Sequence, residues 1–83
     1  MRTVTHYGRD GCHLCDDARA ALQRVREQHP FALDEVDITR DDDLHARYLE
    51  RIPVVWVNGE ELFEYFVDEA ALRRRLALLW AGE

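Results

Sequence analysis

The order of apolar and polar residues near the start of the chain changes from a strand pattern to a loop and then to a helix pattern. Residues Thr3 to Tyr7 alternate β-branched, small and aromatic side chains, as in a short strand, and a glycine follows them. From Leu14 onward apolar residues recur at helical spacing until Pro30, which ends the predicted helix. The apolar positions of this helix are Leu14, Ala18, Ala21, Leu22 and Val25.

A second strand and a short helix are predicted in the middle of the chain. Apolar residues separated by acidic ones extend from Phe31 to Ile38, which is the pattern of a strand. The sequence Thr39-Arg40-Asp41-Asp42 matches a capping box, so a short helix should follow it. Ile52-Pro53 should end that helix, because the residue before a proline is driven toward extended geometry. The apolar face of the short helix consists of Leu44, Tyr48 and Leu49.

The last part of the chain predicts a hairpin and a final helix. Val54 to Val57 is a continuous β-rich run, as in a strand covered on both faces. Asn58-Gly59 is a strong signal for a tight turn, after which Glu60 to Phe66 should pair back as an antiparallel strand. Asp68 is placed to cap the last helix. The inward positions of that helix are Ala71, Leu72, Leu76 and Leu79.

The predicted order of elements is therefore β-α-β-α-β-β-α. Right-handed crossover connections make the first two strands parallel, whereas the hairpin makes the last two antiparallel. We expect an α/β fold in which a four-stranded mixed sheet is flanked by three helices. The chain has 83 residues and 47% hydrophobic content, so residues 1–83 should form a single domain.

Composition and charge narrow the classes of binding partner and the cellular compartment that we expect. A net charge of −6 and a pI near 5.1 argue against nucleic-acid binding, and we expect Arg73-Arg74-Arg75 to form a solvated helix face. The longest apolar run, Leu76 to Ala81, is far too short to span a membrane. The first residues lack the apolar stretch of a secretory signal. We expect a cytoplasmic protein that binds neither nucleic acid nor membranes.

The two cysteines of the chain, Cys12 and Cys15, form a C-x-x-C motif between the first strand and the first helix. The unpaired amides at a helix N-terminus stabilise a thiolate and lower a cysteine pKa below its free value of about 8.5. Cys12 is therefore the expected attacking thiolate. Cys15, one turn into the helix, is the expected buried resolving thiol. This arrangement predicts thiol–disulfide exchange.

Four landmarks together resemble a glutaredoxin-like protein of the thioredoxin-fold superfamily. They are Tyr7 to Cys15, Ile52-Pro53-Val54, Asn58-Gly59, and the closing helix from Asp68. Two departures from that family are visible. His13-Leu14 replaces the usual Pro-Tyr between the cysteines, and Phe63-Glu64-Tyr65-Phe66 fills the place of a Gly-Gly that lets glutathione approach the backbone. The resemblance implies the fold and the dithiol chemistry, whereas glutathione as the reductant does not follow.

Four residues are expected to bind substrate, of which the resemblance implies three, Arg9, Ile52 and Pro53, while His13 is singled out because it adjoins Cys12. Pro53 matches a proline that is cis and faces the dithiol, which would turn the backbone N–H and C=O of Ile52 toward an incoming extended peptide or tripeptide. Arg9 matches a basic position that could bind a glutathione carboxylate or help hold the thiolate, and a solvated loop arginine is the alternative. His13 either tunes the redox potential or is an exposed residue without a special partner.

The function that we expect is that of a monomeric thiol–disulfide oxidoreductase that reduces protein disulfides or glutathione mixed disulfides. No bound cofactor is expected, and electrons would come from glutathione, another thiol, or a thioredoxin-reductase-like enzyme. Two alternatives remain open. A dimer could share a metal ion or iron–sulfur cluster through Cys12, with further ligands supplied from outside the chain, because no metal-ligand spacing is visible. The chain could also be a redox-inactive binding module of the same fold.

Overall fold

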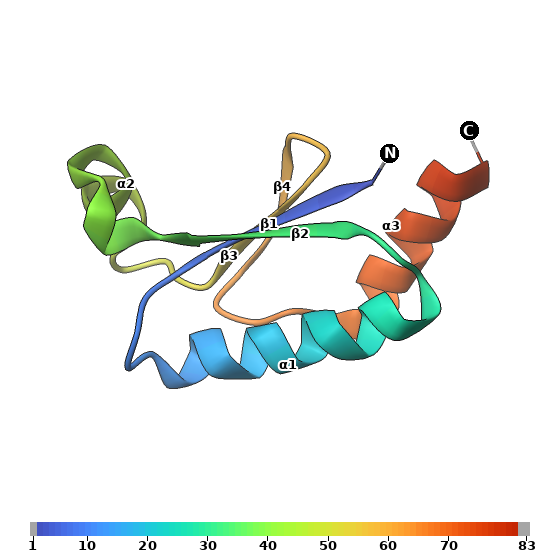
Figure 1. Ribbon diagram of the computed structural model, residues 1–83, viewed down its shortest axis with the longest axis horizontal. Helices are drawn as coiled ribbons and strands as arrows, with labels where there is room; N and C mark the ends of the chain where they lie inside the picture. Colours follow the sequence, from blue (N-terminus) through green and yellow to red (C-terminus); the bar gives the residue numbers. More distant parts are fainter. Residues whose placement is uncertain (1, 82–83) are drawn as a thin grey trace.

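The computed structural model describes residues 2–81, and the side chains of this part up to Leu78. In chain order the elements are β1 (Thr3–Gly8), α1 (His13–Gln28), β2 (Ala32–Asp37), a 3-10 turn η1 (Ile38–Arg40), α2 (Asp42–Tyr48), β3 (Val54–Val57), β4 (Glu60–Glu64) and α3 (Glu69–Ala81) (Figure 1). The predicted order β-α-β-α-β-β-α is thus confirmed. The predicted inward position of Leu79 lies outside the described side chains.

The sheet has the strand order β2-β1-β3-β4. β1 is parallel to β2, and β3 is antiparallel to both β1 and β4, as the connections predict. Asn58 (φ 48°) and Gly59 (φ 83°) form the two-residue turn between β3 and β4 in the left-handed conformation that this type of hairpin requires. The mixed four-stranded sheet is therefore confirmed.

β4 ends at Glu64, two residues before the predicted end at Phe66. The cause lies in the backbone of Tyr65, which adopts a φ of 69° and so leaves the extended conformation. The Tyr65 N–H donates instead to the carbonyl of Pro53, at 2.8 Å. The chain beyond β4 is thereby attached to the residue that precedes β3.

One apolar cluster joins the sheet to α1 and α3. Figure 1 shows that α1 runs along one face of the sheet and that α3 lies beside the C-terminal half of α1. Arg24 of α1 and Glu69 of α3 form a bidentate ion pair across this contact, at 2.8 Å for the shortest distance. The buried members of the cluster are Val4, Leu22, Val25, Phe31, Val55, Val57, Leu72 and Leu76.

A second apolar cluster lies beside the C-x-x-C motif and holds α2 in place. Tyr48 is its largest member and contacts the ring of Tyr7, with 5.0 Å between the ring centroids. Because this cluster contains both Cys15 and Ile52, it brings the helix start and the segment before β3 together. Its buried members are Cys15, Ile38, Tyr48, Ile52 and Val54.

The start of α2 differs from the predicted capping box. Asp41, and not Thr39, is the N-cap, because its carboxylate accepts the backbone N–H groups of Asp43 and Leu44 at 2.9 and 3.0 Å. Thr39 lies within the preceding 3-10 turn, where its hydroxyl donates to Asp37 at 2.6 Å.

Leu49 was also predicted on the buried face of α2, and this is wrong: it is the C-cap residue and is 41% exposed. The helix ends at Tyr48, which is its buried residue, so Leu49 lies just beyond the helix.

Candidate functional site

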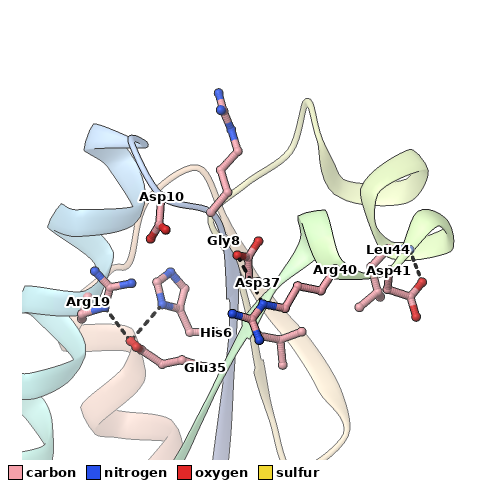
Figure 2. Close-up of a pocket in the computed structure, with 11 residues that line it drawn as sticks. His6, Gly8, Asp10, Arg19, Glu35, Asp37, Arg40, Asp41 and Leu44 are labelled. Carbon is pink, nitrogen blue, oxygen red and sulfur yellow. Dashed lines mark hydrogen bonds and ion pairs between the residues drawn. The ribbon is translucent and has the colours of Figure 1, made fainter.

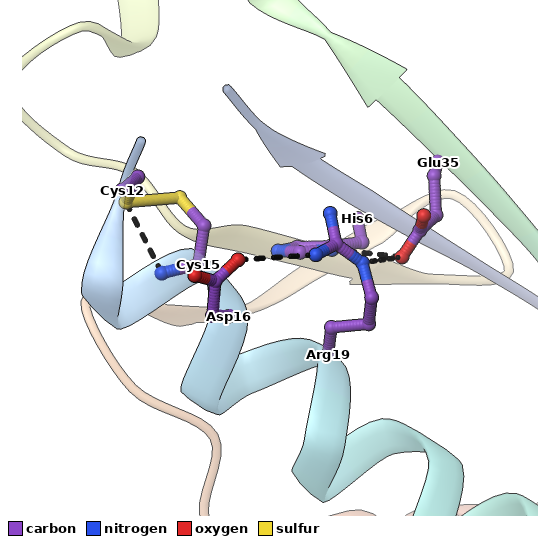
Figure 3. Close-up of polar contacts among 6 residues, drawn as sticks. All are labelled: His6, Cys12, Cys15, Asp16, Arg19 and Glu35. Atoms are coloured by element: carbon purple, nitrogen blue, oxygen red, sulfur yellow. Dashed lines mark hydrogen bonds and ion pairs between the residues drawn. A yellow bond between two sulfur atoms is a disulfide. The ribbon is translucent and has the colours of Figure 1, made fainter. Parts of the chain in front are cut away.

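Cys12 and Cys15 form a disulfide at the start of α1, with 5.1 Å between their Cα atoms (Figure 3). Cys12 is the N-cap residue, and its Sγ accepts the backbone N–H of Cys15 at 3.1 Å. Cys12 is partly exposed, whereas Cys15 is fully buried. The disulfide therefore joins one sulfur that a substrate can reach to one that it cannot.

The local electrostatics favour negative charge on the accessible sulfur. The Cys12 backbone is extended (φ −99°, ψ 109°), which turns its side chain back over the unpaired amides of the first helical turn. Asp16, in the same turn, has its carboxylate 3.2 Å from the guanidinium of Arg19. Its charge is thus paired with a cation one turn along the helix.

The peptide bond between Ile52 and Pro53 is cis, as the resemblance implied. Ile52 belongs to the same buried cluster as Cys15, and Cys12 packs against that cluster, so the structure brings the cis bond next to the dithiol. The N–H of Ile52 donates to the carbonyl of Tyr48, at 3.0 Å. The expectation that this N–H faces an incoming peptide is therefore wrong, because a helical carbonyl already holds it.

Arg9 and His13 are both exposed on either side of Cys12. His13 is the first residue of α1 and points to solvent. Arg9 borders a polar cavity of about 590 Å³, together with Asp10 of the same loop and Gly8 at the end of β1 (Figure 2). The other lining residues come from β1, α1, β2 and the segment up to α2: His6, Arg19, Glu35, Val36, Asp37, Arg40, Asp41 and Leu44.

A chain of polar contacts that was not predicted from the sequence ends beside the dithiol. Glu35 accepts a hydrogen bond from Arg19 Nε at 2.7 Å, and its same oxygen lies 3.5 Å from Nδ1 of His6 (Figure 3). His6 is buried, with 1% of its surface exposed. The available signal was its inward position in the first strand, between Val4 and Gly8.

Burial and neighbouring charge shift the pKa values along this chain. Burial lowers the pKa of His6, and the hydrogen bond and charge of Glu35 oppose that effect. Burial alone would raise the pKa of Glu35, but the bonds and charges of Arg19 and His6 together hold it below its usual value. His6 is consequently neutral and Glu35 ionised near pH 7.

The surface on the other side of the cis-proline is aromatic. Tyr65, joined to the Pro53 carbonyl, is 46% exposed, and Phe66 is 69% exposed. These residues stand in the segment where the resemblance would place Gly-Gly, and Tyr65 keeps a positive φ that glycine adopts more readily. Bulky apolar side chains thus occupy this edge of the site.

Two features are absent from residues 2–81. In this part of the chain no three His, Cys, Asp or Glu side chains gather in a way that could hold a metal ion. Within the same range, no helix is long and apolar enough to cross a membrane.

A family model described as "Glutaredoxin-like domain (DUF836)" matches residues 3–77 of the chain. Two solved structures have substantial identity to it. Protein Ne2328 from Nitrosomonas europaea is 32% identical, with 89% of each chain covered and a TM-score of 0.77. Protein XcR50 from X. campestris is 38% identical, with 90% of this chain and 96% of that chain covered and a TM-score of 0.75.

A more distant similarity concerns the fold alone. Chloroplastic thioredoxin z is 14% identical, with 99% of this chain and 80% of that chain covered and a TM-score of 0.78. The α/β arrangement of a mixed four-stranded sheet with three helices is thus that of the thioredoxin-like fold.

Proposed function

The chain belongs to the glutaredoxin-like domain family, and from this premise we propose that it is a thiol–disulfide oxidoreductase. Its substrates would be protein disulfides or glutathione mixed disulfides. The observation that supports this most directly is the disulfide between Cys12, partly exposed at a helix N-terminus, and the fully buried Cys15. In such a pair, Cys12 can attack the substrate, and Cys15 can then resolve the mixed disulfide.

The proposed reaction has two exchange steps. The Cys12 thiolate attacks one sulfur of the substrate disulfide, which forms a Cys12–substrate bond and releases the other sulfur as a thiolate. Cys15 then loses its proton and attacks Cys12 Sγ, which forms the Cys12–Cys15 disulfide and releases the second substrate thiolate. Two electrons pass from the dithiol to the substrate, and the two released thiolates take up two protons.

The surroundings of Cys12 favour a protein substrate over the tripeptide alone. Tyr65 and Phe66 offer exposed aromatic surface beside the cis-proline, where apolar side chains of a protein could pack. Arg9 and His13, on the loop side, would contact the substrate or a carboxylate of glutathione. The protein would act as a monomer without a bound cofactor, and its partners would include neither nucleic acid nor membranes.

The decisive experiment is a trapping assay. Cys15→Ser should accumulate a mixed disulfide between Cys12 and a protein substrate such as insulin, because the resolving sulfur is gone, and Cys12→Ser should form none. Mass spectrometry under non-reducing conditions shows whether either variant carries the mixed disulfide. Full multi-turnover reduction of insulin by Cys15→Ser would overturn the proposal.

The electron donor is addressed by a second assay. Turnover of insulin and of a glutathione mixed disulfide is compared with glutathione or with thioredoxin reductase as the reductant. We expect the protein disulfide to be the better substrate with either donor. A strong preference for the glutathione mixed disulfide would assign the aromatic edge a different role.

A further inference from the structure

His6 has a ring nitrogen that the fold leaves without a partner. Its Nε2 is buried and has no hydrogen-bond partner among the described residues. Leaving a buried polar atom unsatisfied costs about 1–3 kcal/mol, so such an atom in a folded protein calls for an explanation. The residue is 1% exposed and its side chain points toward α1, the helix that carries the dithiol (Figure 3).

The unsatisfied nitrogen and the buried sulfur both lie close to Gly8. If Gly8 had a Cβ atom, that atom would lie 3.0 Å from Cys15 Sγ and 3.5 Å from His6 Nε2. The two atoms therefore border the same small space, which Gly8 leaves free because it has no side chain. The Cβ atom of any other residue at this position would contact both of them.

The other ring nitrogen fixes which proton form faces the cysteine. Glu35 lies directly opposite His6 in the parallel register of β1 and β2, and its carboxylate only accepts hydrogen bonds. In the neutral ring, Nδ1 therefore carries the hydrogen and Nε2 presents a lone pair. Arg19, bonded to Glu35 at 2.7 Å, holds the carboxylate in place.

Resting on the proposed function, we propose that His6 is the proton acceptor for the Cys15 thiol in the resolving step. In that step the S–H bond of Cys15 breaks and its proton passes to His6 Nε2. The Cys15 thiolate forms the bond to Cys12 Sγ, while the Cys12–substrate bond breaks and the substrate sulfur leaves with the electron pair. The imidazolium, stabilised by Glu35, then returns the proton to the leaving thiolate or to solvent.

The groups that face His6 from the neighbouring elements are consistent with this role. Glu35 from β2 is the nearest charge. Val55, which pairs with His6 from β3, is apolar. Through the cavity the ring also faces the charged loop residues. The charged and titratable groups from α1 and the cavity wall are Cys15, Asp16, Arg19, Arg9, Asp10, Asp37, Arg40 and Asp41. A negative partner on Nδ1 strengthens the base, which a neutral environment would weaken.

The test separates the two thiol steps. Reduced protein is mixed with dithio-bis-nitrobenzoate, an aromatic disulfide whose released thiolate is coloured. Attack by Cys12 releases the first thiolate, and attack by Cys15 on the mixed disulfide releases the second. In His6→Gln the second release should slow by about tenfold or more near neutral pH, as general-base loss does, with the first changed less than about twofold.

The pH profile distinguishes this role from a structural one. The difference between wild type and His6→Gln should shrink at alkaline pH, where hydroxide removes the thiol proton. A slowing by the same factor at every pH, or no slowing of the second release, would overturn the proposal. His29→Gln, at the opposite end of α1, is the matched control and should leave both releases unchanged.

A second variant covers the case in which His6→Gln does not fold. Glu35 is on the surface, so Glu35→Gln should fold while removing the charge that strengthens the base. Its second release should slow severalfold at neutral pH, and an unchanged rate would overturn the proposal. The wild type tests the proposed function independently: if it releases only one thiolate, the dithiol mechanism fails, whatever the variants do.

Discussion

Cys15 Sγ approaches the backbone of Gly8 so closely that a Cβ there would lie 3.0 Å from the sulfur. Gly8 does not have a positive φ, so contact, and not backbone conformation, favours glycine at this position. Gly8→Ala should force the start of α1 away from β1 and lower the free energy of unfolding by about 1–3 kcal/mol, as overpacking does. Urea denaturation of the oxidised protein measures this change.

A double-mutant cycle attributes that cost to the sulfur. In a Cys15→Ala background Gly8→Ala should cost clearly less, because the closest atom has been removed, although Cys15 Cβ remains 3.3 Å away. An equal cost in both backgrounds would show that the sulfur is not the cause.

The pH dependence of stability should reflect the burial of His6. Its pKa is lowered in the folded protein, whereas in the unfolded chain it takes up a proton near its ordinary value of 6.5. Below that pH the unfolded state binds more protons, so stability is fully present above about pH 6.5 and declines as the pH falls. Urea titrations at about pH 7.5 and about pH 5.5, where carboxylates stay largely ionised, measure the decline.

His6→Gln removes the titrating group and is the control for this decline. It should lose less stability than the wild type over the same pH interval. Equal losses in the two proteins would assign the decline to other groups.

The N-cap of α2 offers a prediction about stability alone. Asp41→Ala removes the acceptor of two backbone N–H groups and should cost about 1 kcal/mol. Thr39→Ala, the matched control, loses one exposed hydroxyl contact and should cost less than half as much. Thermal or urea unfolding compares the two. A larger loss for Thr39→Ala would contradict the observed cap.

The aromatic edge should influence the choice of substrate. Replacing Tyr65 and Phe66 together by glycine removes exposed side chains beside Pro53 and frees the backbone for a small ligand. We expect the ratio of turnover on a glutathione mixed disulfide to turnover on insulin to rise severalfold. The control is Leu49→Ala, which changes an exposed apolar residue elsewhere. Leu78→Gly is not suitable, because Leu78 lies within α3. An unchanged ratio would mean that this edge does not select substrates.

The sequence predicted those parts of the fold that depend on local pattern. The order of strands and helices, the Asn58-Gly59 turn and the Asp68 cap appear as expected, since each depends on neighbouring residues in the chain, whereas the cap of α2 and the end of β4 differ. The cis bond at Pro53 followed from the resemblance. The paired cysteines were found because their spacing alone places both at the helix start.

The remaining features required the three-dimensional arrangement. His6 faces Glu35 only through the register of two parallel strands, and Arg19 reaches them only through the rotation of α1 about its axis. Neither is encoded in local spacing. The Ile52 N–H was misplaced for a local reason: it donates to the carbonyl of Tyr48, four residues earlier, and so continues the helical hydrogen-bond pattern beyond the end of α2.

Because only one of the two sulfurs is exposed, exchange with other molecules can take place only at Cys12. In the proposed cycle, a reductant that regenerates the dithiol would attack Cys12, the same sulfur through which substrates would be reduced, because Cys15 is fully buried. In the proposed cycle the donor thiol attacks the oxidised Cys12–Cys15 pair, whereas the substrate disulfide is attacked by the reduced pair, so the two react at the same sulfur in turn. The steady-state rate should therefore show ping-pong kinetics, with parallel lines in double-reciprocal plots at different donor concentrations.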